Sequence, residues 1–304
     1  MASLDLAPGA NRGATPGREL IRRAPPMRAR RLLIAGCGEL GAATAAALSG
    51  VTVYGLRRSV QNLPLGIEPV AADLLTGDGF ERLPDEIDTL VYAPTPAART
   101  EEGYRSIYVD ALSRLLEALP RPARSLRLIY VSSTAVYGQN AGESVDEDSD
   151  CQPLGFNGRV LLDGERRAAQ SRADHVALRL SGLYGPGRHW LLRRVRAGTA
   201  IAPGEHWTNR IHVEDAGALV ATLAQREFVP AQVIGVDDAP TTEREVLDWI
   251  AARLGLPQLP ELPGVATVSG KRLRNDLSRS LGWRPRYASY RDGYTSELPG
   301  NTRP

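Results

Sequence analysis

The sequence predicts an α/β fold in which a doubly wound parallel sheet is followed by a small C-terminal α/β domain. Apolar, strand-like runs alternate with helix-like segments after residue 30, a pattern typical of parallel sheets covered on both faces. A glycine-rich turn joins the first run to an alanine-rich segment of high helix propensity. The chain has 304 residues, 42% of them apolar and 24% charged, which suits one large or two small globular domains.

The glycine-rich turn follows a buried strand at 32–35 and precedes a helix at 42–48. Gly36 can adopt the positive φ of a tight turn, and Gly38 has no Cβ to block a phosphate. Gly41 lets helix and strand pack closely. Because the first amides of a helix attract anions, this strand–turn–helix predicts a Rossmann-type dinucleotide site. A glycine-rich βα turn without a ligand is the alternative interpretation.

The residues after the second strand bear on the choice of cofactor. In a dinucleotide-binding βαβ unit, an acidic residue about 20 positions after the glycines binds the ribose hydroxyl of NAD. Here the strand at 51–54 is followed by Gly55, Arg57 and Arg58. Guanidinium groups suit a 2′-phosphate, so the sequence favours NADP over NAD. Two solvated arginines are the alternative.

The remaining elements follow from hydrophobic periodicity and from helix start and stop signals. Asp73, in the third strand, is expected to meet the adenine edge. Strands are expected at 69–75, 87–93, 126–131 and 233–236, and helices at 101–119, 156–169, 244–254 (opened by the capping box Thr242-x-x-Glu245) and 271–281.

Composition limits the classes of partner and compartment. Net charge is +2 with arginines scattered along the chain, so nucleic acid is not expected. No apolar run reaches membrane-spanning length, and two cysteines make no disulfide framework, so we expect a cytoplasmic protein with no membrane partner. No cluster has metal-ligand spacing, so no metal is expected. Residues 1–30 lack periodicity and are expected to form a disordered tail.

Three further segments carry a resemblance to a known family. They are 132–138 (SSTAVYG), 179–187 (RLSGLYGPG) and 209–215 (NRIHVED). Together with the glycine turn they resemble the extended short-chain dehydrogenase/reductases of the nucleotide-sugar epimerase and dehydratase type, over roughly residues 31–295. The resemblance implies a Rossmann domain at 31–180, mainly a substrate domain at 181–300 with segments returning to the first sheet, and a nicotinamide cofactor.

The resemblance also implies a homodimer, paired through the helices at 101–119 and 156–169. Apolar side chains could supply the packed seam: Tyr108, Leu112, Leu115, Leu119, Val160 and Leu161. The implied cofactor contacts are Gly36, Gly38, Glu39, Leu40, Gly41, Arg57, Arg58, Asp73, Leu74, Ala93, Pro94, Ser132 and Leu183. The implied substrate contacts are Thr95, Asn157, Arg188 and Arg210.

The sequence departs from the family in its catalytic set. The family uses a serine or threonine, a tyrosine, and a lysine four residues after the tyrosine; Ser133 matches the serine. Counting back from Glu165 puts the other two positions at Asn157 and Leu161, and neither side chain titrates. Lys271 is the only lysine, so no Tyr-x-x-x-Lys occurs anywhere. The sequence is therefore identified as a member of the atypical branch of the superfamily.

Two functional classes remain open. The first is an enzyme that transfers hydride to or from a hydroxyl or carbonyl of a small-molecule substrate, a class that includes nucleotide sugars. Ser133 would hold the reacting oxygen, and Tyr184 or His189 would carry the proton. Lys271 would be a surface residue or a substrate-phosphate contact. The second class is a non-catalytic NADP-binding sensor or interaction module, which the missing tyrosine and lysine favour.

Overall fold

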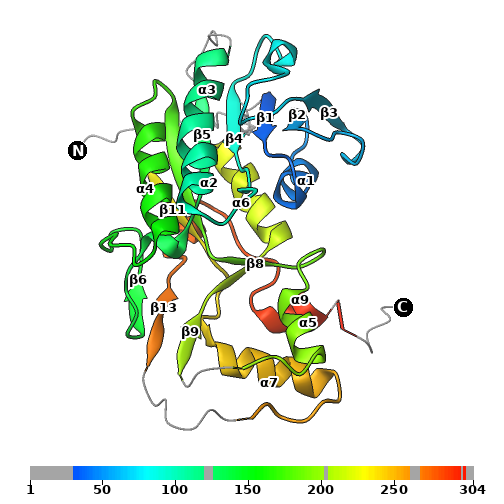
Figure 1. Ribbon diagram of the computed structural model, residues 1–304, viewed down its shortest axis with the longest axis vertical. Coiled ribbons are helices and arrows are strands. Elements are labelled where there is room, and N and C mark those ends of the chain that lie inside the picture. Colours follow the sequence, from blue (N-terminus) through cyan, green and yellow to red (C-terminus); the bar gives the residue numbers. More distant parts are fainter. Residues whose placement is uncertain (1–29, 120–125, 202–204, 261–267, 296, 299–304) are drawn as a thin grey trace, which may run out of the picture.

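The computed structural model describes residues 30–119, 126–201, 205–260, 268–295 and 297–298. Its upper lobe is built on a seven-stranded parallel sheet of order β11-β7-β5-β4-β1-β2-β3 (Figure 1). The strands are β1 Arg31–Ala35, β2 Thr52–Arg57, β3 Ile67–Ala71, β4 Thr89–Tyr92, β5 Arg127–Ser133, β7 Asp174–Leu180 and β11 Gln232–Gly235. Apart from Arg30, the predicted tail lies outside the described residues.

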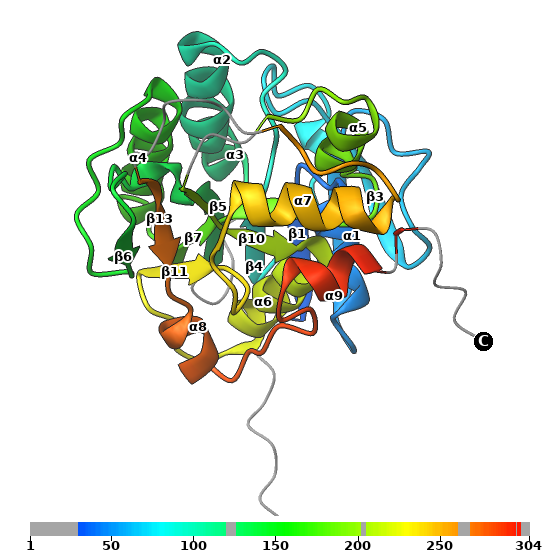
Figure 2. The ribbon, with the colours of Figure 1, turned by 90° about the horizontal axis from the view of Figure 1, so that it is seen from below.

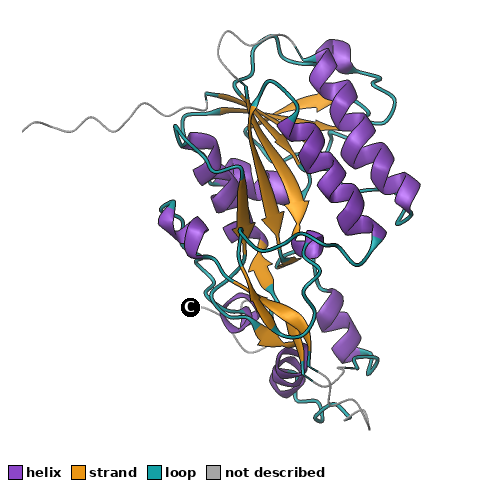
Figure 3. Ribbon diagram, turned by 90° about the vertical axis from the view of Figure 1, so that its left-hand side faces the viewer, coloured by secondary structure: helices purple, strands orange, loops and turns teal. Residues whose placement is uncertain are grey.

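Helices cover both faces of this sheet, which confirms the predicted fold class (Figure 3). Side chains of β1 alternate between two cores: Leu32 and Ile34 face one, and Leu33 and Ala35 face the other. Because both faces are buried, the strands read as continuous apolar runs. The first core lies under α1 (Glu39–Ala46) and α6 (Val213–Gln225), and the second under α3 (Ala111–Ala118) and α4 (Phe156–Ala169), while α2 (Glu101–Arg105) precedes α3 and has no buried residue.

The structure differs in two places from the strands and helices expected from sequence. No helix links β2 to β3, which the structure describes throughout, and β3 ends at Ala71, before the predicted strand at 69–75 would end. The predicted helix at 101–119 contains a π-helical turn, Ser106–Asp110, between α2 and α3. Such turns accommodate an extra residue inside a helix and occur frequently at functional sites.

A lower lobe lies below the carboxyl ends of the parallel strands (Figures 1 and 2). Its sheet has the order β12-β9-β13-β6, and β10 pairs with β8. The strands are β6 Glu143–Val145, β8 Gly182–Tyr184, β9 His206–Thr208, β10 Arg210–His212, β12 Thr241–Thr242 and β13 Ser269–Leu273. The helices are α5 Trp190–Arg196, α7 Glu243–Arg253 and α9 Tyr290–Thr295, whereas α8 Asp276–Ser280 lies against β11 of the upper sheet. Within the described residues, no helix is long and apolar enough to cross a membrane.

The predicted helix at 271–281 is wrong. Ser269–Leu273 is strand β13, paired with β6 and β9, and only Asp276–Ser280 is helical. Pairing with strands distant in sequence outweighs the local helical pattern. Lys271 is consequently half-buried, and its Nζ donates to the backbone carbonyl of Tyr137 at 2.5 Å. The only lysine of the sequence therefore links the lower lobe to the segment that follows Ser133.

The seam predicted for a homodimer is also corrected. Leu112, Leu115 and Val160 are fully buried within the chain, and Leu161 is 4% exposed. The apolar face of each helix covers the chain's own core or the junction between its lobes. A homodimer stays a prediction, but these buried residues cannot form its contact.

Candidate functional site

The glycine turn adopts the conformation that a dinucleotide loop needs. Gly36 has φ +85°, and a Cβ there would lie 2.5 Å from the Cα of Pro94. A Cβ on Gly38 would meet no atom within 4 Å, whereas one on Gly41 would lie 2.9 Å from the Sγ of Cys37. Open space therefore lies over the start of α1, at the β1/β4 boundary where the strand order reverses. A phosphate fits there, against the first amides of the helix.

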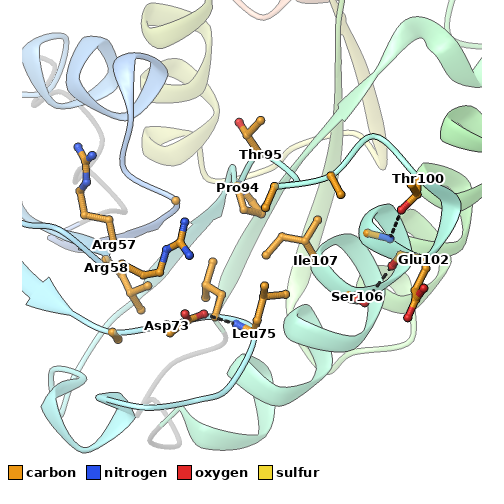
Figure 4. A pocket seen from close by; sticks show the side chains of 17 residues that line it. Arg57, Arg58, Asp73, Leu75, Pro94, Thr95, Thr100, Glu102, Ser106 and Ile107 are labelled. Carbon is orange, nitrogen blue, oxygen red and sulfur yellow. Dashed lines mark hydrogen bonds between the residues drawn. The ribbon is translucent and has the colours of Figure 1, made fainter.

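A pocket of about 410 Å³ adjoins this turn at the carboxyl ends of the first strands (Figure 4). Arg57 and Arg58 lie on one side of it, and Thr100 and Ser106 on the other. Seven of the predicted cofactor and substrate residues line it: Gly36, Arg57, Arg58, Asp73, Leu74, Pro94 and Thr95. Sequence reasoning missed the opposite wall, between residues 97 and 107, because its lining residues form no recognisable motif.

The two arginines are held differently. Arg57 ends β2, is half-buried, and donates from Nη1 to the carbonyl oxygen of Cys37 at 3.3 Å, while Arg58 is exposed. Asp73, in the same pocket, accepts from the backbone N–H of Leu75 at 2.8 Å. Two guanidinium groups at the end of β2 suit a ribose that carries a phosphate.

The other residues predicted to contact the cofactor differ in how deeply their side chains are buried. Leu40 is buried in the core under α1, and the N–H of Ala93 donates to the carbonyl of Ala35 at 2.9 Å. Leu183 is half-buried and packs against the same core. Burial turns the side chain of Leu40 away from any ligand, so that contact is corrected to its backbone N–H, in the first turn of α1.

Ser133 ends β5 at the boundary between the lobes. Its Oγ accepts from the backbone N–H of Ala135 at 3.2 Å, which caps the 3₁₀ turn Thr134–Val136. The hydroxyl proton remains able to donate to a substrate oxygen. The prediction for Ser132 is corrected: its buried Oγ donates to Oε1 of Glu165 at 2.5 Å, so it is not turned toward a cofactor.

Glu165 is the centre of a buried polar network. Arg179 donates to it through two nitrogens, Nη2 to Oε2 at 2.7 Å and Nε to Oε1 at 3.1 Å. Nη1 of Arg179 also donates to the hydroxyl of Tyr137 at 2.8 Å, and burial raises the pKa of Tyr137 to about 12. Sequence reasoning used Glu165 only as an alignment marker. The network supports both ends of the segment from Ser132 to Tyr137.

The positions aligned with the family's tyrosine and lysine lie on α4. Asn157 is half-buried in its first turn, and Leu161 is 4% exposed in an apolar cluster with Val136 and Tyr137. Gly158 brings this helix against the Ser133 turn, since a Cβ there would collide with the carbonyl oxygen of Ala135. Since leucine carries no charge, α4 presents no ammonium group at the lysine position.

The structure argues against Tyr184 as a proton carrier. Its side chain is 3% exposed, and its hydroxyl donates to the carbonyl of Ser289 at 3.2 Å within the lower lobe. The ring packs against Tyr294, with centroids 4.8 Å apart. Burial raises the pKa of Tyr184 well above its usual range. This hydroxyl therefore holds the start of α9 in place.

His189 lies just before α5 and is partly exposed. Its Nδ1 lies 2.9 Å from Oε2 of Glu297. Burial raises the pKa of that carboxyl group. His189 thus has a partner in the lower lobe, and its role as a proton carrier stays a prediction.

Arg210 is a buried cation near a buried acid. Its side chain is 7% exposed, and within the described ranges no hydrogen bond or ion pair engages its guanidinium. Asp237 is 2% exposed, and burial raises its pKa to about 8, against the lowering effect of Arg210. At neutral pH this carboxyl group is therefore mostly protonated. A guanidinium without a carboxylate partner is suited to an anion supplied by a ligand.

The raised pKa of Asp237 predicts a pH dependence of stability. Between about pH 4, where the unfolded side chain titrates, and about pH 8, the folded protein keeps a proton that the unfolded chain has lost. This group should therefore lower the free energy of unfolding as pH rises through the window, by about 1 kcal/mol per pH unit. Asp237→Asn should remove that part of the slope. Urea unfolding of both proteins at pH 5, 6 and 7 measures it, and parallel pH profiles would contradict the assignment.

Arg188, predicted to bind substrate, lies over the start of α1, and its contact with substrate stays a prediction. Its Nε forms an ion pair with Oε2 of Glu39 at 2.7 Å. Sequence reasoning could not find this contact because the two residues are far apart in the chain. Among the described residues, no group of three or more His, Cys, Asp or Glu side chains is arranged to hold a metal ion.

Comparison with known proteins adds to this geometry. The family model described as the RmlD substrate binding domain matches residues 97–198. Protein YeeZ of Escherichia coli K12 is 35% identical over 147 residues, which cover 46% of this chain and 52% of YeeZ, so the chain spans about half the length of that relative. A 3-diazoavenalumate denitrifying reductase of a Streptomyces species is 29% identical over 233 residues, covering 68% of this chain and 73% of the reductase.

A solved structure decides the family. A protein from Methylobacillus flagellatus, described as an NAD-dependent epimerase/dehydratase, is 32% identical, with a TM-score of 0.72 over 88% of this chain and 97% of that one. This chain belongs to the NAD-dependent epimerase/dehydratase type of short-chain dehydrogenase/reductase. MoeE5, solved in complex with UDP-glucose and NAD, shares the fold of this chain at 24% identity and a TM-score of 0.71, over 88% of this chain and 96% of MoeE5.

Membership of this superfamily supports a nicotinamide dinucleotide as the cofactor, and the residues present fit one. The open space at Gly38 and the helix start at Glu39 suit the pyrophosphate, and the adjoining pocket suits the adenosine half. What sets this chain apart is its incomplete acid/base set. Ser133 is retained beside α4, whereas Asn157 and Leu161 replace the tyrosine and lysine that the resemblance would place there.

Proposed function

We propose that this protein is an NADP-dependent oxidoreductase of the epimerase/dehydratase type, acting by hydride transfer on a hydroxyl or carbonyl group. One observation carries the proposal: the open space over Gly38 adjoins a pocket where Arg57 and Arg58 stand at the end of β2. In the Rossmann pattern an acidic residue at that place selects NAD, whereas guanidinium groups accommodate the 2′-phosphate of NADP.

The chain's own residues divide the remaining work. The nicotinamide group supplies or accepts the hydride when it is bound. The amides at the start of α1 hold the pyrophosphate, and Arg57 and Arg58 hold the phosphorylated ribose. Ser133 donates a hydrogen bond to the reacting oxygen of the substrate, which stabilises charge that develops there. Of the two proton carriers expected from sequence, Tyr184 is buried and bonded within the lower lobe, so His189 is the remaining candidate.

The substrate side favours an anionic small molecule. Arg210 brings a buried positive charge to the lower lobe, and the protonated Asp237 leaves that charge available to a phosphate or carboxylate. MoeE5, which shares the fold, was solved with UDP-glucose. We therefore propose a nucleotide sugar as the substrate class.

A second function is favoured by one specific observation. Leu161 fills an apolar cluster at the place of the family's lysine, which suits a protein that binds the cofactor without catalysis. NADPH oxidation with a panel of carbonyl compounds that includes 4-keto nucleotide sugars separates the two functions. Turnover on any member supports the enzyme. Tight NADPH binding without turnover on the whole panel supports a cofactor-binding module.

Cofactor preference gives a direct prediction. Because Arg57 and Arg58 face the same pocket, NADPH should bind several-fold more tightly than NADH, and changing both arginines to alanine should remove the preference. Titrations followed by nucleotide fluorescence measure both affinities. Arg82→Ala is the control, since Arg82 lies outside this pocket and donates to the carbonyl of Ala71. Equal affinities for NADPH and NADH in the unmodified protein would contradict the NADP assignment.

A further inference from the structure

A charged contact joins the two lobes directly over the glycine turn. Glu39 is the first residue of α1 and follows Gly38, whose surroundings are open. Arg188 lies in the loop that enters α5 of the lower lobe, and its Nε is 2.7 Å from Oε2 of Glu39. A guanidinium from the lower lobe therefore lies beside the space that suits the pyrophosphate.

The loop that carries Arg188 is shaped for this contact. Gly187 has φ +80°, and a Cβ there would collide with Oε1 of Glu39. Gly185 has φ +120°, and a Cβ there would lie 2.7 Å from Nε2 of His212. The N–H of Arg188 donates to the carbonyl of Gly185 at 2.9 Å. Two glycines thus let the loop pass closely between the Glu39 carboxylate and the lower lobe.

Glu39 alone would oppose cofactor binding. A carboxylate in the first turn interacts favourably with the helix dipole, but it also repels a pyrophosphate bound to the same helix start. The adjacent guanidinium cancels that charge and still presents N–H groups that can reach phosphate oxygens.

We propose that Arg188 is a phosphate-binding residue for the dinucleotide and that Glu39 is the residue that positions it. The inference rests on the proposed cofactor function, and it reassigns Arg188 from the substrate to the cofactor. The pair holds the lower lobe over the pyrophosphate. Arg188 therefore increases the binding affinity of every ligand that contains a pyrophosphate and leaves the affinity of ligands without one unchanged.

Three ligands test this at equilibrium without any turnover: NADPH and 2′-phospho-ADP-ribose, which contain the pyrophosphate, and 2′-AMP, which does not. Arg188→Gln should lower the affinity for NADPH and for 2′-phospho-ADP-ribose by about tenfold or more, because a charge-assisted contact is lost and Glu39 is left unneutralised. Binding of 2′-AMP should stay unchanged. Calorimetric titration measures all three affinities. Arg193→Gln is the matched control, an exposed arginine in the following helix.

A second variant separates charge balance from a merely structural role. Adding Glu39→Gln to Arg188→Gln removes the uncompensated carboxylate, so the double variant should regain the part of the NADPH affinity that was lost to repulsion, but not the part that came from the contact between Arg188 and phosphate. A surface ion pair of this kind, with side chains 37% and 46% exposed, contributes little to stability, so all variants should unfold at the same temperature as the parent.

Each outcome decides the proposal. It is overturned if Arg188→Gln leaves NADPH affinity within about twofold of the parent, if 2′-AMP weakens equally, or if the double variant regains nothing. If the parent prefers NADH, the NADP assignment fails, and the same comparison with NADH, ADP-ribose and AMP decides the role of Arg188 separately. If the parent binds no dinucleotide at all, both proposals fall.

Discussion

Replacing Glu165 with leucine should lower the free energy of unfolding by about 3–5 kcal/mol, because the change leaves the buried guanidinium of Arg179 without its carboxylate. The side chains of this pair are 10% and 5% exposed, and two hydrogen bonds join them. Removing one partner of a buried ion pair is strongly destabilising, because the remaining ion has lost its hydration on folding and now lacks its partner as well. Urea unfolding followed by circular dichroism measures the change.

Two comparison proteins make this prediction specific. Glu165→Leu combined with Arg179→Met removes both charges and should recover much of the lost stability. Asp163→Ala, on the same helix, breaks the exposed pairs with Arg105 and Arg166 and should cost less than about 1 kcal/mol. A Glu165→Leu protein as stable as the parent would show that the network does not support the fold.

Ser133→Ala should lower turnover about a hundredfold while leaving NADPH affinity nearly unchanged. The reason is that the serine hydroxyl is the one hydrogen-bond donor of the family's catalytic set that this sequence retains. Losing such a donor affects the transition state, where negative charge develops on the reacting oxygen, more than it affects the bound cofactor. Steady-state kinetics on the substrate found in the NADPH screen, with the cofactor titrated separately, measures both effects.

Tyr184→Phe is the matched control for this prediction. It also removes one hydroxyl, but that hydroxyl is bonded to the carbonyl of Ser289 in the lower lobe, so turnover should remain close to the parent value. With Asn157 at the aligned tyrosine position, the pH–rate profile should also lack the titration of an active-site phenol. Robust turnover by Ser133→Ala would refute the assignment and leave the fold standing.

Local sequence patterns were sufficient to predict most strands of the upper lobe and its glycine turn. The apolar runs place its strands because both faces of a parallel sheet are buried, so the runs are continuous and easy to find. The spacing of Gly36, Gly38 and Gly41 predicted the turn, whose geometry depends only on backbone and near neighbours. Helix α4 has the predicted bounds, and the capping box of Thr242 and Glu245 opens α7. These features are decided within a few residues of chain.

Contacts between distant segments decided the rest. Lys271 is on a strand, not a helix, because its backbone pairs with β6, which lies far earlier in the chain. Tyr184 turns into the lower lobe because the segment that leads into α9 supplies its partner, and Glu39 meets Arg188 because the lower lobe folds back over α1. Periodicity reports which face of an element is apolar, but the partner of a polar side chain depends on how segments far apart in the chain are packed.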